Sequence, residues 1–358
     1  MLTKYLVKKI MSERHAIVKG QYCLNVRNKK EKCRKCIEIC PVEAIKQKET
    51  IIVIDKNSCN GCGICNVVCP SQALELSGLS KKIDNSKLDK KAILIGCQEH
   101  NEQMDIMFSC LNGIHAESIA ALLLKLKEKD IYFNVIECKN CNIESDSFIL
   151  ENALKEAKKF IDSLKITINM ELIYKKEHLP IYDETKLTRR ELLSLITKKS
   201  GEITQDITNH MFIDSKEGNL NHREGLLNAI ENLGEAIDEN TLINESLFTT
   251  WDVNLNCDGC SFCQAICPWN SWQIEENEDQ LVIKHSARTC RSCELCFKLC
   301  PNKAIERASC RLYYLQQDII KREIHLISCS RCFTKYILKD NGVEVCPSCA
   351  RSQIRRFV

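Results

Sequence analysis

The stretch Cys257-Asp-Gly-Cys260-Ser-Phe-Cys263-Gln-Ala-Ile-Cys267-Pro268 decides the fold of this chain, because its spacing returns at Cys290-Arg-Ser-Cys293-Glu-Leu-Cys296-Phe-Lys-Leu-Cys300-Pro301. The same spacing occurs earlier as Cys59-x2-Cys62-x2-Cys65-x3-Cys69-Pro70. A fourth run, Cys33-x2-Cys36-x3-Cys40-Pro41, lacks only its leading cysteine. Three thiolates at this spacing wrap one corner of a cubane iron–sulfur cluster, while backbone N–H groups point at the sulfurs. Cys23, ten residues upstream of Cys33, can supply the missing ligand if residues 24–32 loop out.

Two other interpretations of these cysteines are a disulfide framework and several zinc knuckles. A disulfide framework is disfavoured because residues 1–12 contain neither a continuous apolar core nor a cleavage site, as a secretory segment would. Zinc knuckles rarely need three cysteines at this spacing followed by Cys-Pro. We therefore expect iron–sulfur clusters and a reducing, cytoplasmic location.

The composition indicates several small modules rather than one large core. The chain has 358 residues, 25 of them cysteine, and only 6% are aromatic, so inorganic cores must replace large side chains in the cysteine-rich parts. The 51 basic and 48 acidic residues leave a formal charge of +3, which gives no electrostatic reason to expect nucleic acid or a membrane surface as a partner. No apolar run is long enough for a spanning helix, so we expect no membrane insertion.

Over about a third of the chain, the four cysteine runs resemble the bacterial two-[4Fe–4S] ferredoxin family. That resemblance implies that the last cysteine of each run crosses to the neighbouring cluster. The four clusters implied in this way take Cys23, Cys33, Cys36 and Cys69; Cys59, Cys62, Cys65 and Cys40; Cys257, Cys260, Cys263 and Cys300; and Cys290, Cys293, Cys296 and Cys267.

The residues around the runs predict short local elements. After three of the Cys-Pro pairs, residues 42–45, 71–74 and 302–305 indicate a first helical turn, whereas residues 269–272 contain two tryptophans instead. Residues 50–54 and 280–283 give strand signals between the paired runs. The tryptophans could shield a cluster or meet a partner, but we expect them to fill a small core.

The middle of the chain has a βαβ pattern, with buried strands at 91–95 and 131–136 and a helix over 115–129. Cys97, Cys110, Cys138 and Cys141 follow its elements at positions where parallel strands gather ligands. The segment loosely resembles the delta iron–sulfur subunit of hydrogenases that feed heterodisulfide reductases. This resemblance favours a fifth metal centre at the four cysteines, whereas free thiols or a Cys138–Cys141 dithiol remain open.

The last part of the chain predicts a connector and a metal knuckle. Residues 146–164 indicate an amphipathic helix, 166–174 a strand, and 188–199 and 222–237 helices. Cys329, Cys332, Cys346 and Cys349 form two Cys-x2-Cys pairs around Gly342, which is the pattern of a four-cysteine zinc ribbon. Rubredoxin-type iron is the alternative metal. Cys310, His210, His222 and His285 have no ligand partners at a recognisable spacing, so we expect ordinary core or surface roles.

Together these features predict an α+β multidomain chain that resembles polyferredoxin-type electron-transfer proteins. We expect an extension over 1–19, dicluster modules over 20–78 and 248–308, a βαβ domain over 88–175, a helical connector over 176–247 and a zinc ribbon over 325–358. The resemblance implies four [4Fe–4S] clusters and one zinc, and an electron relay between a donor and a partner oxidoreductase. An enzyme acting on a small disulfide or sulfur substrate at the middle cysteines is the alternative, and a redox-sensing regulator is a third. The chain has no Gly-x-Gly-x-x-Gly nucleotide fingerprint, which favours relay over catalysis.

Overall fold

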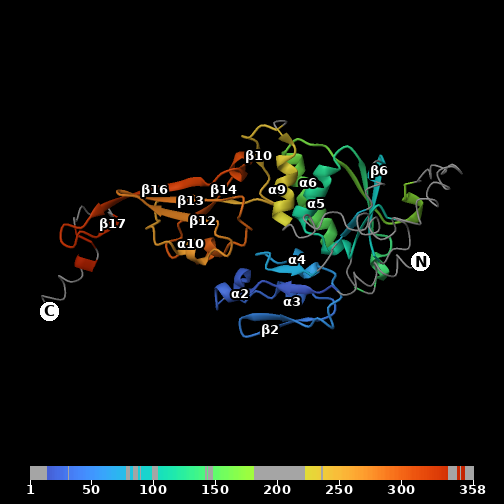
Figure 1. The fold of residues 1–358 in the computed structure, drawn as a ribbon, viewed down its shortest axis with the longest axis horizontal. Helices are drawn as coiled ribbons and strands as arrows, with labels where there is room; N and C mark the ends of the chain where they lie inside the picture. The colour runs from blue at the N-terminus through green and yellow to red at the C-terminus, as the bar shows by residue number, and fades with distance from the viewer. Residues whose placement is uncertain are drawn as a thin grey trace, which may run out of the picture. The chain divides into compact units, whose positions relative to one another are not determined.

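The computed structural model describes residues 14–30, 32–77, 81–83, 88, 90–98, 104–141, 143, 148–180, 222–234, 237–337, 345–346 and 348–350. The chain forms two compact units, Met1–Ile237 and Asp238–Val358 (Figure 1). The first unit contains a cysteine-rich module and a five-stranded sheet, and the second contains another cysteine-rich module that continues into a four-cysteine hairpin. The expected mixed α/β, multidomain organisation is confirmed.

The cysteine-rich module of the first unit consists of two small antiparallel sheets, with a short helix inside each cysteine run. Its elements are β1 (Ala16–Val18), η1 (Gly20–Tyr22), α2 (Leu24–Arg27), α3 (Lys35–Glu38), β2 (Ile45–Lys48), β3 (Ile51–Ile54), α4 (Ile64–Val67) and β4 (Leu74–Leu76). Strand β1 pairs with β4 and β2 pairs with β3, so segments far apart in sequence close the module around its cysteines. Apolar side chains of both sheets pack against those cysteines.

The helical turns expected after the Cys-Pro pairs are wrong. In the structure Ile45, Leu74 and Ile305 each begin a β-strand, as does Trp272 after the fourth pair. The reason is a turn that precedes each strand, in which the third residue after the cysteine has a positive φ of about 50°. These residues are Glu43, Gln72, Asn270 and Lys303. A left-handed residue at this point ends the local turn and sends the chain into an extended strand.

The middle sheet of the first unit has the strand order β5-β7-β6-β8-β9. The elements of this part of the chain are β5 (Lys81–Ile83), β6 (Ala92–Cys97), β7 (Ile106–Phe108), η3 (Leu111–Gly113), α5 (Ala116–Lys125), β8 (Asp130–Asn134), η4 (Cys138–Asn140), α6 (Phe148–Ser163), β9 (Asn169–Ile173) and η5 (Lys176–His178). A later helix, α9 (His222–Glu231), packs against α5. Strands β7, β6, β8 and β9 are parallel and β5 runs antiparallel to β7. The expected βαβ unit is therefore present.

The core of this sheet comes from the buried runs of β6 and β8 and from one face of each helix. Ile93, Ile95 and Phe133 are completely buried, and Leu150 and Ile161 of α6 pack inward at helical spacing. Each such side chain contributes about 1.5–3 kcal/mol of burial free energy. Helices α5, α6 and α9 lie together beside the sheet (Figure 1). The helix expected over 188–199 lies outside the described residues.

A buried ion pair holds α9 against α5. Arg223 Nη2 donates to Glu117 Oε1 over 2.7 Å, and both side chains are at most 3% exposed. The amide of Gln72 donates to the same carboxylate over 3.0 Å, which joins this pair to the cysteine-rich module. Removal of either partner would leave a buried charge uncompensated, so loss of this pair would destabilise the packing of α9 on α5.

The second unit repeats the module and adds one long strand. Its elements are β10 (Leu242–Ile243), β11 (Thr250–Val253), α10 (Phe262–Ile266), β12 (Trp272–Glu276), β13 (Gln280–His285), α11 (Leu295–Leu299), β14 (Ile305–Ala308), β15 (Cys310–Arg311), η8 (Leu312–Leu315), β16 (Ile319–Ser328) and β17 (Lys335–Ile337). Strands β12, β13, β16 and β17 form one antiparallel sheet. Strand β16 thus carries the chain from the module to the C-terminal cysteines.

None of the helices in the described ranges has the length and hydropathy that crossing a membrane would require.

Candidate metal centres

The four cysteines of centre 1, namely Cys23, Cys33, Cys36 and Cys69, lie together in the first module. They line a single hollow, together with Pro70 and Leu74. Burial and then the thiolates of its three partners raise the pKa of Cys36 to about 12. The structure therefore brings together the set that the crossing of the last cysteine implies.

Cys23 reaches this hollow because the segment between Cys23 and Cys33 is folded rather than simply looped out. Helix α2 begins directly after Cys23, and the buried side chain of Asn25 turns back toward Cys33. Asn25 Nδ2 donates to the carbonyl of Cys33 over 2.9 Å, and the N–H of Cys33 donates to Asn25 Oδ1 over 3.0 Å. These two bonds satisfy the backbone N–H and carbonyl of Cys33, as a neighbouring strand would. They also hold the segment that follows Cys23, the displaced ligand, against Cys33.

Centre 2 comprises Cys40, Cys59, Cys62 and Cys65. Burial and then the charges of Cys59 and Cys40 raise the pKa of Cys62 to about 11. Burial followed by the charges of neighbouring cysteines, Cys62 and Cys59 first among them, also raises the pKa of Cys65. Cys40 thus lies with the second run although it ends the first, while Cys69 lies with the first although it ends the second.

Centre 3 comprises Cys257, Cys260, Cys263 and Cys300 in the second unit. These cysteines line a hollow whose remaining walls include Phe262, Pro301 and Ile305. Burial and then the charges of Cys257 and Cys260 raise the pKa of Cys263 to about 12. Cys260 is exposed, so this centre lies close to solvent on one side.

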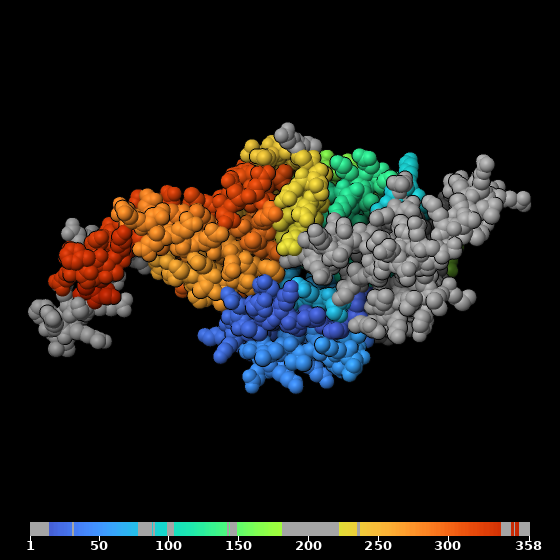
Figure 2. All heavy atoms as spheres, in the orientation of Figure 1, coloured from blue at the N-terminus to red at the C-terminus, as the bar shows by residue number. Residues whose placement is uncertain are grey.

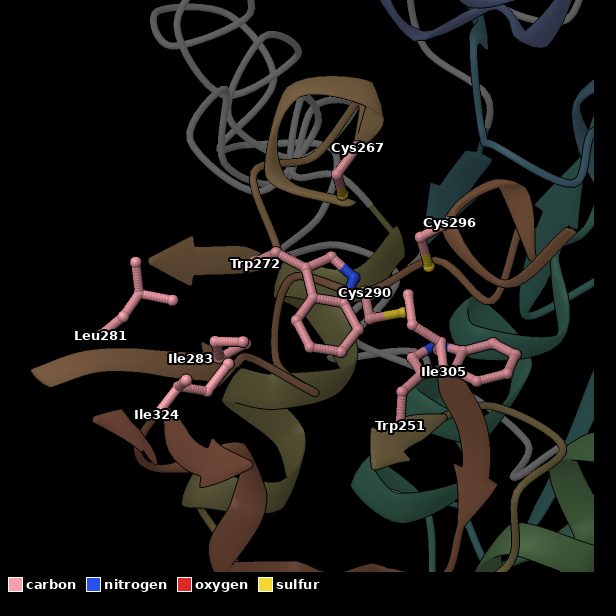
Figure 3. Close-up of a cluster of buried hydrophobic side chains, with 9 residues drawn as sticks. All are labelled: Trp251, Cys267, Trp272, Leu281, Ile283, Cys290, Cys296, Ile305 and Ile324. Carbon is pink, nitrogen blue, oxygen red and sulfur yellow. The ribbon is translucent and has the colours of Figure 1, made fainter. Parts of the chain in front are cut away.

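Centre 4 comprises Cys267, Cys290, Cys293 and Cys296, and Cys267, Cys290 and Cys296 lie in the apolar core of the second unit (Figure 3). Burial and then the charges of Cys290 and Cys267 raise the pKa of Cys293 to about 12. Burial raises the pKa of Cys296, and a hydrogen bond from the indole N–H of Trp272 lowers it. Figure 3 shows the Trp272 nitrogen on the side that faces the sulfurs of Cys290 and Cys296. Of the two tryptophans in residues 269–272, Trp272 is 1% exposed within the core and contacts a cysteine of centre 4, whereas Trp269 is partly buried and packs against that core. Trp251, also 1% exposed, is a further core tryptophan.

Backbone N–H groups point at the sulfurs in both modules. The N–H four residues after the last cysteine of a run donates to its sulfur: Ala73 to Cys69 over 3.2 Å, Ser271 to Cys267 over 3.3 Å and Ala304 to Cys300 over 3.3 Å. The positive φ of the preceding residue turns this N–H toward the sulfur. Such donors stabilise a thiolate and the added negative charge of a reduced cluster.

The chemistry of these four centres fits an iron–sulfur cluster. Each has four thiols around one site, and burial together with the mutual repulsion of the thiolates raises the pKa of several of them. A positively charged iron core removes this repulsion and releases the thiol protons on binding. That the named cysteines ligate iron stays a prediction.

Centre 5 comprises Cys97, Cys110, Cys138 and Cys141 around the middle sheet. Cys97 ends β6, Cys110 follows β7, and the last two cysteines follow β8, so all lie beyond the carboxyl ends of neighbouring parallel strands. The chain order reverses at β6, where open α/β sheets bind their ligands. Burial and then the charges of Cys97 and Cys141 raise the pKa of Cys138 to about 12, so the structure brings these thiols within electrostatic range.

Centre 5 lies against centre 2. Cys110 and Cys62 belong to one buried cluster with Ile64, and after burial the charge of Cys62 is the largest influence that raises the pKa of Cys110. Gly113 permits this contact, because a Cβ there would lie 1.9 Å from the carbonyl oxygen of Cys62. The backbone of η3 therefore packs directly on the loop that carries a centre 2 ligand.

The C-terminal centre, here called the ribbon, comprises Cys329, Cys332, Cys346 and Cys349. Its four sulfurs lie within 4.8 Å of one another, and Cys332 Sγ is 3.6 Å from Cys346 Sγ. A tetrahedral zinc with Zn–S bonds of about 2.3 Å separates its sulfurs by roughly 3.8 Å, so the spacing fits zinc. The N–H of Cys346 donates to Cys329 Sγ over 3.3 Å and lowers the pKa of Cys329 to about 6, which prepares a thiolate for a metal. Gly342 lies outside the described residues.

The remaining predicted residues lie apart from the metal centres or outside the described residues. Cys310 is completely buried in β15, as expected for a small apolar side chain. His285 is 1% exposed against Trp272, and burial lowers its pKa to about 3, so it is neutral. His210 lies outside the described residues.

His222 is more than an ordinary surface residue. Its ring stacks on His115 at 4.8 Å, and its nitrogens lie 2.6 Å from the amide of Asn66 and 2.7 Å from the hydroxyl of Ser118. Asn66 directly follows a centre 2 ligand, so this histidine joins α9 and α5 to the first module. No sequence signal indicated this role, or those of Asn25 and Trp272, because each depends on contacts that spacing alone does not encode.

Comparison with known proteins identifies iron–sulfur domains in both units. Residues 256–304 match the 4Fe–4S dicluster domain and residues 51–74 match a 4Fe–4S binding domain. The chain therefore carries ferredoxin domains, and the expected [4Fe–4S] chemistry of these segments is confirmed at the level of the domain.

Individual relatives match only parts of the chain. Hydrogenase-4 component A of Escherichia coli is 44% identical over 43 residues, which cover 12% of this chain and 21% of that protein. One component of an ion-translocating oxidoreductase complex of Methanosarcina acetivorans is 43% identical over 44 residues, 12% of this chain and 17% of that protein. An uncharacterized ferredoxin of Methanocaldococcus jannaschii is 40% identical over 53 residues, 15% of this chain and 32% of that protein. The chain thus spans a third or less of the length of these relatives.

Proposed function

We propose that this protein relays single electrons through four [4Fe–4S] clusters, at centres 1 to 4, between a donor and a partner oxidoreductase. The observation that carries the proposal is the exchange of the last cysteines, by which Cys40 joins the second run and Cys69 joins the first. This exchange builds two adjacent four-thiol sites into one peptide framework. A [4Fe–4S] cluster supplies one-electron exchange without bond breaking in a substrate.

The protein's own groups control how readily such a centre accepts charge. Backbone N–H groups aimed at Cys69, Cys267 and Cys300 favour the more negative, reduced state. Apolar side chains such as Ile52 and Leu74 exclude water from the first module. Arg34 and Lys35, which lie between two ligands of centre 1, favour reduction of that centre because their positive charges stabilise the added electron.

Centre 5 extends the relay as a further iron–sulfur site in this proposal. Support comes from the contact of Cys110 with Cys62, which places the middle cysteines directly beside centre 2. Replacing Cys138 and Cys141 by Ser should lower the iron content while centres 1 to 4 stay loaded. Normal iron content together with rapid alkylation of both thiols in the native protein would contradict a fifth cluster.

A thiol-based enzyme at centre 5 is the second candidate function. The observation that favours it is the partial exposure of Cys138 and Cys141, which a small disulfide could reach. If that function is correct, the metal-free pair should reduce a small aromatic disulfide, and the double Ser variant should not. The relay predicts no turnover in either protein.

For the ribbon we propose a structural zinc, with rubredoxin-type iron as the alternative. The close sulfur spacing and the lowered pKa of Cys329 support tight binding of a single divalent ion. Metal analysis of the loaded protein distinguishes the two, because a zinc ribbon adds one zinc per chain to the iron of the clusters and a rubredoxin-type centre adds none.

The relatives named as hydrogenase and oxidoreductase components support a place for this chain as an electron-transfer component of a larger complex. We propose that it works in the reducing cytoplasm, where all 25 thiols stay available to metals. We propose neither nucleic acid nor direct membrane insertion as part of its action. Cell fractionation followed by capture of the loaded chain tests both location and partner.

Electron transfer itself is tested with anaerobically loaded protein, reduced methyl viologen as donor and cytochrome c as acceptor. Loaded protein should accelerate this transfer repeatedly without being consumed. Cys69→Ser should slow it, because centre 1 loses a ligand, whereas Cys310→Ser serves as a matched control since Cys310 is buried outside every centre. Equal rates with wild-type protein and the Cys69 variant would contradict relay through the first module.

A further inference from the structure

A basic segment borders centre 1 and has no counterpart in the second module. Residues 27–38 contain six basic residues and two acidic ones, although the whole chain is close to electrical balance. The corresponding residues before and within the centre 3 run, 254–266, contain no basic residue and one acidic residue. The two modules differ in cysteine spacing only at the displaced Cys23, and the basic residues lie between Cys23 and Cys36, where that difference occurs.

The basic side chains of this segment are exposed and lie beside the ligands. Lys29, Lys30 and Lys32 are exposed, and Cys33, which follows them, is partly exposed. Lys35 lines the hollow of centre 1 itself. The deep-blue atoms in Figure 2, which include this segment, form part of the molecular surface. Exposed Lys32 therefore directly precedes a ligand of centre 1, and exposed Lys35 lines the hollow of that centre.

Hydrogen bonds anchor the backbone of the segment at Asn28, Lys30 and Cys33. Asn25, which is 1% exposed, binds both the N–H and the carbonyl of Cys33. The N–H of Asn28 donates to the carbonyl of Leu24 over 2.8 Å, which closes α2, and the N–H of Lys30 donates to Asn28 Oδ1 over 3.2 Å. An insertion with no role beyond reaching Cys33 would need neither this anchoring nor this concentration of charge.

From these observations we propose that the segment Arg27–Lys35 is a docking surface for an acidic redox protein, which exchanges electrons with centre 1. The inference rests on the proposed relay and adds the port and the charge of its partner. Fixed lysines around a redox centre attract a negatively charged surface and orient it, so that encounter is faster than for a neutral pair by roughly 10- to 1,000-fold. Centre 3 is bordered instead by the exposed Leu255 and Phe262, and residues 254–266 contain no basic residue.

The test uses the triple variant Lys29→Glu, Lys30→Glu and Lys32→Glu in fully loaded protein. Its control is the triple variant Lys155→Glu, Lys158→Glu and Lys159→Glu on the exposed side of α6. This control changes the net charge by the same amount, at positions far from the segment in sequence. An acidic flavodoxin is the protein probe, and Fe(III)–EDTA and cobalt(III) hexaammine are the anionic and cationic small oxidants. Iron content and the reduced spectrum are measured first in each protein.

At an ionic strength of about 0.02 M we expect the segment variant to exchange electrons with flavodoxin at least about 10-fold more slowly than wild type. Its reaction with Fe(III)–EDTA should slow and that with the cobalt complex should quicken, while the α6 variant stays near wild type. The difference should vanish at about 0.5 M salt, where screening removes the field.

Equal losses in both triple variants would show that only net charge matters and would overturn the docking surface. Unchanged rates in the segment variant would do the same. Tight binding of a 20-nucleotide RNA that is lost only in the segment variant would reassign the surface to nucleic acid. If the Glu variant fails to load centre 1, the Gln variant at the same three positions should show a smaller but still selective loss. Absence of a reducible centre 1 in wild type would instead contradict the proposed relay.

Discussion

Replacing Gly113 by Ala tests whether the middle sheet is held against the first module as the relay through centre 5 requires. The new Cβ would lie 1.9 Å from the carbonyl oxygen of Cys62 and 3.1 Å from Cα of Gly63. Ordinary contact begins near 3.4 Å, so the two backbones must separate by about 1.5 Å. Both atoms that Cβ meets belong to backbone, which cannot turn aside as a side chain could.

This separation has a thermodynamic and an electronic consequence. Overpacking of this kind costs about 1–3 kcal/mol, which should lower the Tm of the first unit by roughly 2–12 °C. Cys110 moves away from Cys62, so the magnetic interaction between centres 2 and 5 in the reduced protein should weaken. Electron transfer between them should slow as well.

Thermal melting and electron paramagnetic resonance of loaded protein measure these effects. Gly225→Ala is the control, because a Cβ at Gly225 meets nothing within 4 Å and lies inside α9. That change should stabilise the unit by about 0.5–1 kcal/mol through helix propensity. A Gly113 variant that melts and couples like wild type would refute the direct contact between η3 and the centre 2 loop.

Three further changes probe a ligand, a hydrogen bond to a ligand and a buried histidine. Cys23→Ser should remove one cluster, about four irons, and leave the second unit's spectrum intact, as iron analysis will show; unchanged iron would place that ligand elsewhere. Trp272→Phe removes the hydrogen bond to Cys296, which stabilises the reduced state of centre 4. One reduction potential should therefore fall by on the order of 40 mV for each 1 kcal/mol of stabilisation lost. A potentiometric titration that matches wild type would exclude the bond. Burial holds the pKa of His285 at about 3, below the value of this residue in the unfolded chain. As pH falls, His285 is therefore protonated in the unfolded state but not in the folded state, and the free energy of unfolding decreases. Denaturant melts should therefore lose about 1.4 kcal/mol between pH 7.5 and 5.5 in wild type and not in His285→Gln, whereas equal losses would show that His285 is not the group responsible.

The composition of the cysteine groups could be predicted from the sequence because the spacing recurs and each last cysteine follows the same rule. The parallel strands β6 and β8 could be predicted as well, since their buried aliphatic runs leave little choice of structure. The helical turns predicted after the Cys-Pro pairs were wrong, because the left-handed positions there are occupied by residues such as Glu43 and Lys303. Only a glycine at these positions would have signalled a left-handed turn in the sequence. Extended strands therefore replaced the expected helical turns.

The contacts that tune and connect the centres could not be predicted from local sequence either. The Asn25 bonds to Cys33 and the Trp272 bond to Cys296 join residues that are eight and 24 positions apart. The approach of Cys110 to Cys62 depends on how η3 packs on another module. Such packing is decided by tertiary shape, and a spacing rule for ligands cannot contain it. The domain boundaries expected from the sequence stay predictions.

The most direct test of the proposed relay is the iron, acid-labile sulfide and zinc content of the protein after anaerobic loading. Four cubanes at centres 1 to 4 require about sixteen irons and as many sulfides, a cluster at centre 5 adds to both, and the ribbon adds one zinc. We expect this composition for a single chain. Eight irons or fewer in fully loaded protein would contradict it.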